Sequence, residues 1–386
     1  MNKSRAGRCA RAIVCACLVA TLAACGGGGS GGGDTSAPAT TTTTTPASPP
    51  SSPSLSPQPA RITQITLNSD PGDFVGASQQ YEYDLTNAQI TVSASGALLR
   101  VSVLGDKTWN GDFQLPSGLN QLVPGTYSGV TRDLGGPTST ATMDWSGDGR
   151  GCGTLTATLS INSVRYDGAA LGAVNLDFEM HCEGATPALH GHLAWDASDP
   201  PYVGAPENPI PTSLWTAPAS ALPATGNAMY FVSDPGDTVG QGGTWWVNTN
   251  PAGTGASGPS TPGTVVVTGS GNQIGVVVSA GNEVWSGQFV GMLGQPQLQV
   301  GYYADLGHVP INNPVRGGLS WEMDGGSCNT ANGWFAIDGI SYEDGQLVSV
   351  DMRFAQYCGG SASGLHGRIR WSNAPTAPQS VSKAPR

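Results

Sequence analysis

Charged side chains, and basic ones above all, are scarce in this sequence. Only 11% of its 386 residues are charged, and 16 Lys and Arg residues stand against 27 Asp and Glu residues, which gives a formal net charge of −11 at pH 7. A protein that neutralises phosphates needs clustered Lys and Arg side chains. The acidic balance therefore argues against nucleic acid, or any anionic surface, as the binding partner.

The sequence also lacks the short motifs of common catalytic and cofactor sites. It contains no Walker loop, no H-E-x-x-H zinc motif, and no G-x-S-x-G outside the glycine-rich N-terminal stretch. We predict no cofactor and interpret the chain as a protein that is not an enzyme. The paired carboxylates of a glycosidase need only be close in space, so an uncatalogued envelope hydrolase stays open as an alternative.

The N-terminus has the features of a secretion signal over residues 1–24. Basic residues precede the apolar run "AIVCACLVATL", which is too short to span a bilayer as a mature helix. The run ends in "LAAC", whose last residue is Cys25, and Gly26 follows. This arrangement resembles the lipobox of bacterial lipoproteins. The resemblance implies that Cys25 carries palmitate or similar acyl chains and anchors the protein to a membrane of the bacterial cell envelope. The glycine after Cys25 implies the outer membrane, and two or more chains anchor stably.

Residues 25–60 follow as the lipidated cysteine and a stalk of Gly, Thr, Pro and Ser. This composition offers almost no apolar side chain whose burial could offset the entropy of ordering the backbone. We therefore expect a disordered, partly extended tether that holds a folded body away from the lipid. The tail over 374–386 is expected to be disordered as well.

Four cysteines remain after the signal segment and Cys25 are set aside, and they lie in two pairs with equal spacing. An even number of cysteines in an exported chain indicates disulfides, and the short spacing of a zinc site is absent. We predict one bond within each repeat. The predicted pairs are Cys152–Cys182 and Cys328–Cys358.

A long internal repeat organises the rest of the chain. "FEMHCEGATPALHGHLAW" begins at Phe178, and "FAQYCGGSASGLHGRIRW" begins 176 positions later, at Phe354. Further upstream, "SDPGDFVG" and "SDPGDTVG" match at a shift of 164, which places an insertion in a Gly/Ser/Pro-rich loop. A period this long suits tandem domains rather than a solenoid. The predicted units are repeat 1 over 61–197, a Pro-rich linker with little to bury over 198–225, and repeat 2 over 226–373.

Within each repeat, apolar residues alternate with polar ones, and no stretch shows the 3.6-residue period of a helix. Val174, Leu176, Phe178 and Met180, for example, alternate with Asn, Asp and Glu. Short alternating runs separated by Gly, Pro, Asn and Asp are typical of antiparallel sheets with one buried face. We predict an all-β chain with two tandem antiparallel β-sandwiches, each a jelly-roll-like fold of about eight or nine strands.

His190 and His366 share one position in the closing strand of the two repeats. The apolar face of this strand repeats faithfully, whereas the other residues beside the histidines do not. One imidazole per repeat, without a matched acid, nucleophile or second ligand, makes a poor active site. We expect both histidines to be structural.

Two further groups are weak candidates for binding sites. Carboxylates flank the Pro-Gly turn in both SDPGD motifs, where they could bind calcium or cap the turn, and capping is favoured. Three tryptophans without a counterpart in repeat 1 could stack on sugar rings or fill the core of repeat 2. The aspartates are Asp70, Asp73, Asp234 and Asp237, and the tryptophans are Trp245, Trp246 and Trp334.

Together, "SDPGDxVG", "WxGxF" and the closing Phe–Cys–Leu–Gly pattern resemble an uncharacterised β-rich module of bacterial surface proteins, of the "FEQHCEG…ALxG" type. The resemblance covers most of both repeats and implies no established activity or site residues. The leading interpretation is a membrane-anchored surface lipoprotein with non-catalytic binding or adhesion modules. Its partner would be an envelope or extracellular ligand, with glycans among the candidates. A pair of carbohydrate-binding modules is the first alternative.

Overall fold

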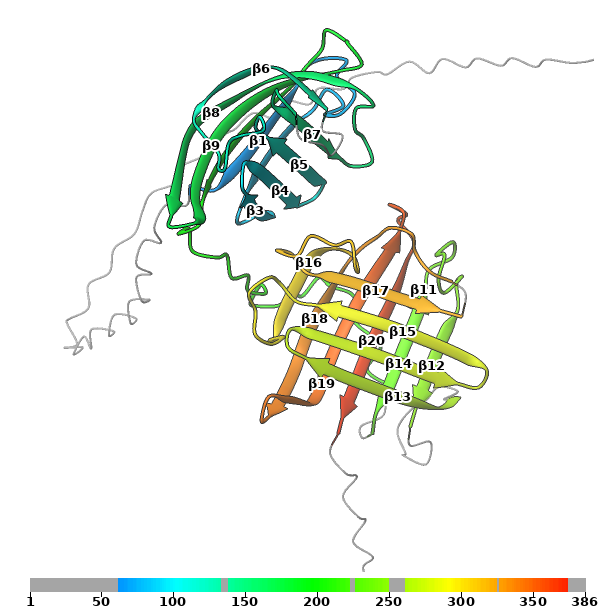
Figure 1. Ribbon diagram of the computed structural model, residues 1–386. Coiled ribbons are helices and arrows are strands. Elements are labelled where there is room, and N and C mark those ends of the chain that lie inside the picture. The colour runs from blue at the N-terminus through cyan, green and yellow to red at the C-terminus, as the bar shows by residue number, and fades with distance from the viewer. Residues whose placement is uncertain (1–61, 133–137, 223–225, 250–260, 325, 374–386) are drawn as a thin grey trace, which may run out of the picture. The chain divides into compact units, whose positions relative to one another are not determined.

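The computed structural model describes residues 62–132, 138–222, 226–249, 261–324 and 326–373, whose regular structure consists of two sheets of ten strands each (Figure 1). Among these residues, the structure contains no helix that is long and apolar enough to cross a membrane. The predicted signal segment, Cys25, the stalk and the C-terminal tail lie outside the described residues.

The sheet of repeat 1 has the strand order β2-β1-β10-β9-β8-β6-β7-β5-β4-β3. Neighbouring strands are antiparallel, except that β6 and β7 are joined by a short parallel pairing. The two longest strands, β8 and β9, curve around one side of the sheet (Figure 1). The strands are β1 (Gln64–Ser69), β2 (Gln80–Asp84), β3 (Gln89–Ser95), β4 (Leu98–Leu104), β5 (Thr108–Gln114), β6 (Gly125–Arg132), β7 (Thr142–Gly147), β8 (Leu155–Asp167), β9 (Ala170–Cys182) and β10 (Leu189–Asp196).

The sheet of repeat 2 has the corresponding order, β11-β12-β13-β14-β15-β17-β16-β18-β19-β20, and closes into a barrel because β11 also pairs with β20. In Figure 1, β13, β14, β15 and β17 cross in front of β18, β19 and β20. The strands are β11 (Ala228–Ser233), β12 (Thr244–Asn248), β13 (Thr261–Ser270), β14 (Gln273–Ala280), β15 (Glu283–Val290), β16 (Gly301–His308), β17 (Gly318–Met323), β18 (Ala331–Glu343), β19 (Gln346–Cys358) and β20 (Gly364–Ser372).

The two strand orders follow the sequence repeat element by element, from β1 and β11 to β10 and β20. They differ where the sheet closes. In repeat 2, β12 and β13 make a short parallel pairing, Val247 with Thr261 and Asn248 with Pro262. In repeat 1, β2 and β3 are the two ends of the sheet order. Repeat 1 is therefore an open version of the barrel of repeat 2.

The all-β prediction is confirmed, but the strands of each repeat hydrogen-bond into one continuous sheet of ten rather than into two packed sheets of a jelly roll. Alternation in the sequence specifies which face of a strand is buried, and both architectures require the same alternation. The sheet order includes pairings between strands that are not consecutive in the sequence, such as β5 with β7 and β6 with β8. The sequence pattern carries no signal for these pairings.

The core of each repeat contains the side chains that alternation predicted. In β9 the buried residues alternate with outward ones along the strand, ending at Cys182. Trp145 and its counterpart Trp321 are fully buried, and each lies against a glycine of the neighbouring strand. A Cβ at Gly111 would lie 2.2 Å from the Trp145 ring, and one at Gly287 would lie 2.0 Å from Trp321. These glycines repeat because only glycine leaves room for the indole.

Both predicted disulfides are present. Cys152 bonds Cys182 at the end of β9, and Cys328 bonds Cys358 at the end of β19. Each bond ties the loop before a long strand to the end of the neighbouring long strand. In a loop-entropy description, a bond across this separation stabilises its repeat by about 3–4 kcal/mol.

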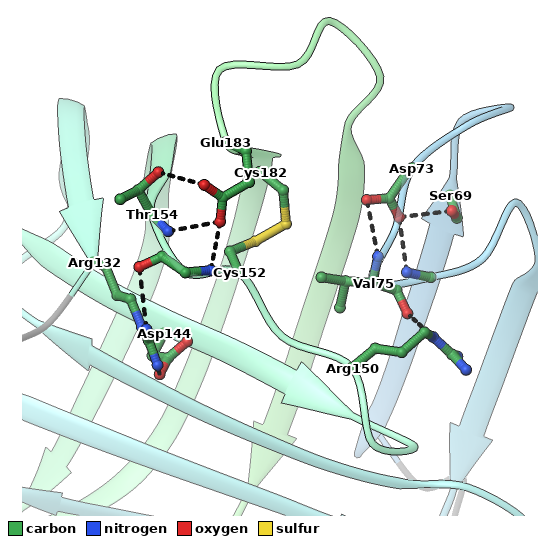
Figure 2. Close-up of a disulfide and its surroundings, with 12 residues drawn as sticks. Ser69, Asp73, Val75, Arg132, Asp144, Arg150, Cys152, Thr154, Cys182 and Glu183 are labelled. Carbon is green, nitrogen blue, oxygen red and sulfur yellow. Dashed lines mark hydrogen bonds and ion pairs between the residues drawn. A yellow bond between two sulfur atoms is a disulfide. The ribbon is translucent and has the colours of Figure 1, made fainter.

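A carboxylate reinforces the disulfide of repeat 1. Glu183, which follows Cys182, accepts hydrogen bonds from Gly153 N at 2.6 Å and from Thr154 N at 2.9 Å (Figure 2). The hydrogen bonds from Thr154 are the largest cause of a Glu183 pKa below its ordinary value. The charged form of Glu183 therefore holds the loop on the other side of the disulfide.

Candidate functional site

The second aspartate of each SDPGD motif caps the turn after the first strand of its repeat. Asp73 Oδ2 accepts hydrogen bonds from Ser69 Oγ at 2.7 Å and Gly76 N at 2.8 Å (Figure 2). Asp237 accepts from Ser233 Oγ at 2.9 Å, and both aspartates are buried. These contacts are those of the capped turn that the sequence favoured over calcium ligation. In the part of the chain that the structure describes, no group of three or more His, Cys, Asp or Glu residues is arranged to hold a metal.

The first aspartate of the motif contacts the closing strand. Asp70 N donates to Ala188 O at 2.9 Å, and Asp70 Oδ2 accepts from Ala188 N at 3.1 Å. The other carboxylate oxygen of Asp70 lies 3.4 Å from Nε2 of His190. One side chain therefore ties the turn both to the backbone and to the histidine of the closing strand.

Repeat 2 contains the same arrangement. Asp234 N donates to Gly364 O at 2.9 Å, Asp234 Oδ2 accepts from Gly364 N at 3.0 Å, and His366 Nε2 lies 3.4 Å from that oxygen. The expectation that the repeated histidine has no matched acid is therefore wrong. Alignment at a single shift hides the pair, because the aspartates repeat at a shift of 164 and the histidines at 176.

The surroundings of the two His–Asp pairs differ sharply. In repeat 1, the side chain of His190 is 43% exposed, and its second ring nitrogen lies 3.6 Å from Glu179. It belongs to an outward-facing set that we call the polar face, on β8, β9, β10 and the turn after β1. The polar face consists of Asp70, Thr158, Asn162, Asp177, Glu179, His181, His190 and His192.

Polar contacts within β9 and between β9 and its neighbouring strands order the polar face. His192 Nδ1 lies 2.7 Å from Asp177, and His181 Nε2 lies 3.1 Å from Glu179. The hydrogen bond to Glu179 raises the pKa of His181 above its ordinary value. Burial acts to raise the pKa of Asp177, but hydrogen bonds from Asn162 and His192 outweigh burial and leave that pKa below its ordinary value. Asp177 is therefore ionised at neutral pH.

In repeat 2, the linker covers the corresponding surface. We call residues 206–222 the strap. The ring of Trp215 stacks on His366, with centroids 5.4 Å apart and planes 23° apart, and the His366 side chain is only 13% exposed. Arg353 donates from Nη1 to the carbonyl of Trp215 at 3.0 Å. Glu207 and Tyr302 exchange two backbone hydrogen bonds of 2.9 Å.

Two apolar clusters join the strap to repeat 2. In the first, Ile210, Leu214 and Trp215 lie against residues of β18 and β19, among them Trp334. In the second, strap alanines and Leu222 lie against residues of β11 and β12. The expectation that the linker has little to bury is therefore wrong. The clusters comprise Ile210, Leu214, Trp215, Tyr302, Trp334, Ala336, Ala355 and Tyr357 in one, and Trp215, Ala217, Ala221, Leu222, Ala228, Tyr230, Val232 and Trp246 in the other.

The covered surface of repeat 2 is equivalent in strand position to an outward surface of repeat 1 that includes part of the polar face, namely Thr158, Glu179 and His181. Alignment of the paired strands shows that outward apolar residues of repeat 2 replace polar residues of repeat 1. Apolar residues suit the surface that the strap buries in repeat 2, and polar residues suit the exposed surface of repeat 1. The equivalent pairs are Trp334 and Thr158, Ala336 and Ser160, Ala355 and Glu179, Tyr357 and His181, Tyr230 and Thr66, and Trp246 and Glu82.

This comparison explains the three tryptophans that lack a counterpart. Trp334 is 9% exposed and lies beneath the strap, so its ring offers no free face to a sugar while the strap is in place. Trp246 lies 5.3 Å from Tyr230 in the second strap cluster. Trp245 lies edge-on to the core residue Trp285 at 5.8 Å. Two of the three therefore belong to the surface that receives the strap, and one packs against the core.

No protein-family model, curated protein or solved structure matches this chain. The arrangement itself therefore has to support any functional conclusion. It offers a partly exposed surface of carboxylates, imidazoles and one amide in repeat 1, and an aromatic surface filled by the strap in repeat 2.

Proposed function

We propose that this chain is a lipid-anchored surface protein of the bacterial outer membrane, and that repeat 1 binds an extracellular or envelope ligand through its polar face without catalysis. The lipobox ending in Cys25 supports the anchor. The observation that carries the binding role is the contrast between the repeats. One fold surface is built twice, filled by the chain's own strap in repeat 2 and lined with polar side chains in repeat 1.

The chemistry of the polar face indicates what the ligand offers. Asp177 and Glu179 are acceptors held in place by neighbouring imidazoles, and Asn162 adds an amide beside them. Rigidly held acceptors favour ligands that donate hydrogen bonds or carry positive charge. Amino sugars and polyols have these properties, as do cationic peptides. A carbohydrate-binding role is the second candidate, because several acceptors with fixed spacing on neighbouring strands suit the hydroxyl groups of a glycan.

The test uses the full chain with Cys25→Ser, to keep it soluble, on a printed glycan array and on isolated peptidoglycan. Glu179→Gln and Asp177→Asn remove the two charges while keeping the side-chain shapes. Hydrogen bonds to charged groups contribute about 1.5–3 kcal/mol, so each variant should bind about tenfold more weakly or worse. Asp112→Asn is the matched control, because Asp112 is an exposed aspartate of repeat 1 that is ion-paired with Arg100 on β4, outside the polar face. Failure to bind any probe, or equal losses in the control, would reject the proposal.

A further inference from the structure

The strap binds repeat 2 as a peptide ligand would. It contains Pro206, Pro209, Pro211 and Pro218, and none of its residues belongs to a strand. The prolines restrict the backbone torsions of the strap, and two turns interrupt it, closed by hydrogen bonds from Leu214 N to Pro211 O and from Ala221 N to Pro218 O. Elsewhere, proline-rich segments are recognised by grooves lined with aromatic side chains. A segment that has few conformations before binding loses little conformational entropy when it binds.

The surface under the strap has this aromatic lining. Tyr302 and Trp334 lie 6.0 Å apart at one end, and Tyr230 and Trp246 lie 5.3 Å apart at the other. Trp215 of the strap lies between them, stacked on His366 and parallel to Tyr230, with an angle of 4° between the two planes. The strap is thus held mainly by rings and apolar side chains, with a few backbone ties.

The main core of repeat 2 does not include the strap. The large cluster inside the barrel contains residues of the strands and of loops within the repeat, and the Cys328–Cys358 disulfide is part of it. The strap contributes only to the two separate clusters on the outer surface. The barrel therefore keeps its core and its disulfide when the strap leaves.

We propose that the outer face of β11, β12, β18, β19 and β20 is a binding site for a proline-rich segment that carries a tryptophan, and that the strap is the resident ligand that blocks it. Such a segment of another protein can bind when the strap is displaced, with its tryptophan in the place of Trp215 over His366. This site is distinct from the polar face of repeat 1, so it does not depend on the function proposed above, and the two tests use different probes.

The experiment measures binding of a fluorescein-labelled peptide with the sequence of residues 206–222 to the full Cys25→Ser chain by fluorescence anisotropy. The chain's own strap competes with the peptide, and apparent affinity falls with the fraction of open sites. Trp215→Ala in the protein weakens that competitor, so we expect the variant to bind the peptide about tenfold more tightly than the chain with Trp215, or better. Thr212→Ala, an exposed strap position, is the control and should leave peptide affinity unchanged.

A second peptide, with alanine at the position of Trp215, should not bind the Trp215→Ala protein. Leu214→Ser replaces Trp215→Ala if the latter fails to give a native-like thermal melt. If neither variant folds, the strap is part of the domain core and the proposal is wrong. Absence of peptide binding to a folded variant also overturns it. Binding of chito- or cello-oligosaccharides to the folded variant, with no binding of the peptide, would assign the aromatic surface to carbohydrate instead.

Discussion

Replacing the repeated histidine with glutamine should affect the two repeats unequally. His366 lies under the ring of Trp215 and 6.1 Å from the ring of Tyr357, and its Nδ1 has no hydrogen-bond partner among the described residues. Glutamine can keep the single contact to Asp234 but not the ring contacts. Aromatic pairs contribute about 0.5–1.5 kcal/mol beyond burial, so His366→Gln should cost about 1–2 kcal/mol.

His190 has the same partner type but a different setting. It is 43% exposed and lies 3.4 Å and 3.6 Å from two carboxylates that are themselves about half exposed. Exposed ion pairs contribute about 0–1 kcal/mol, so His190→Gln should cost roughly half a kcal/mol. The two substitutions are therefore a matched pair within one chain, and each repeat serves as the control for the other.

Differential scanning calorimetry of the full Cys25→Ser chain measures both costs. For a domain of this size, each kcal/mol lowers the melting temperature by about 2–4 °C, so His366→Gln should shift one transition by about 2–8 °C. His190→Gln should move a transition by about 1–2 °C. Equal shifts, or a larger shift for His190→Gln, would refute the argument from burial. Loss of peptidoglycan or glycan binding in His190→Gln, with unchanged melting, would show that this member of the polar face contacts the ligand and contributes little to folding.

Three further outcomes are expected. Cys25→Ser should release the protein from the membrane fraction and abolish incorporation of labelled palmitate; continued labelling would contradict the lipobox interpretation. Residues 61–198 and 226–376 should each give one cooperative melt under oxidising conditions, since each has its own core and disulfide, and the second fragment should bind a hydrophobic dye because the strap is missing; broad melts would indicate one shared core. Glu183→Gln should lower the melting temperature of repeat 1 at pH 7. Because folding depresses the Glu183 pKa, its stabilisation is present above the unfolded-state pKa of about 4.3 and is lost as pH falls through the lower folded-state value, so the two melting temperatures should converge toward pH 3. A difference that does not shrink on acidification would show that the charge of Glu183 is not what stabilises the loop.

Much of the architecture follows from local sequence pattern. The alternation in β9 and the equal spacing of the cysteines predict a buried face and two disulfides, and both are observed. These features depend on interactions that recur at fixed intervals along the chain. Sheet closure does not depend on a recurring interaction of this kind, because β12 and β13 pair through only two residue pairs across a long insertion.

The strap illustrates a second kind of limit. Its apolar residues Ile210, Leu214 and Trp215 are scattered among prolines without strand or helix periodicity, so composition alone suggests an unpacked linker. A signal was nevertheless present in the repeat. Outward positions that are polar in one copy and apolar in the other, such as Glu179 and Ala355, indicate a surface that is covered in only one of them.

The antiparallel pairing of first and last strands determines how each repeat would bear a mechanical load. In repeat 1, the start of β1 lies beside the end of β10, with Gln64 opposite Ala194 and Ser69 opposite Leu189. A pull between an N-terminal anchor and a ligand held on β9 and β10 would act on this seam from the Gln64 end. Its hydrogen bonds would then break one after another, as in a zipper, rather than all together.

Carboxylates close this seam at both ends. Asp199 accepts hydrogen bonds from the backbone of Ile62 and Thr63 where the pull would begin, at 2.6 Å in the case of Thr63. Asp70 holds Ala188 and His190 at the far end. Peeling would break the Asp199 bonds first and reach the Asp70–His190 contact last. In repeat 1, the Asp70–His190 contact would therefore be the last tie of this seam to break under such a pull.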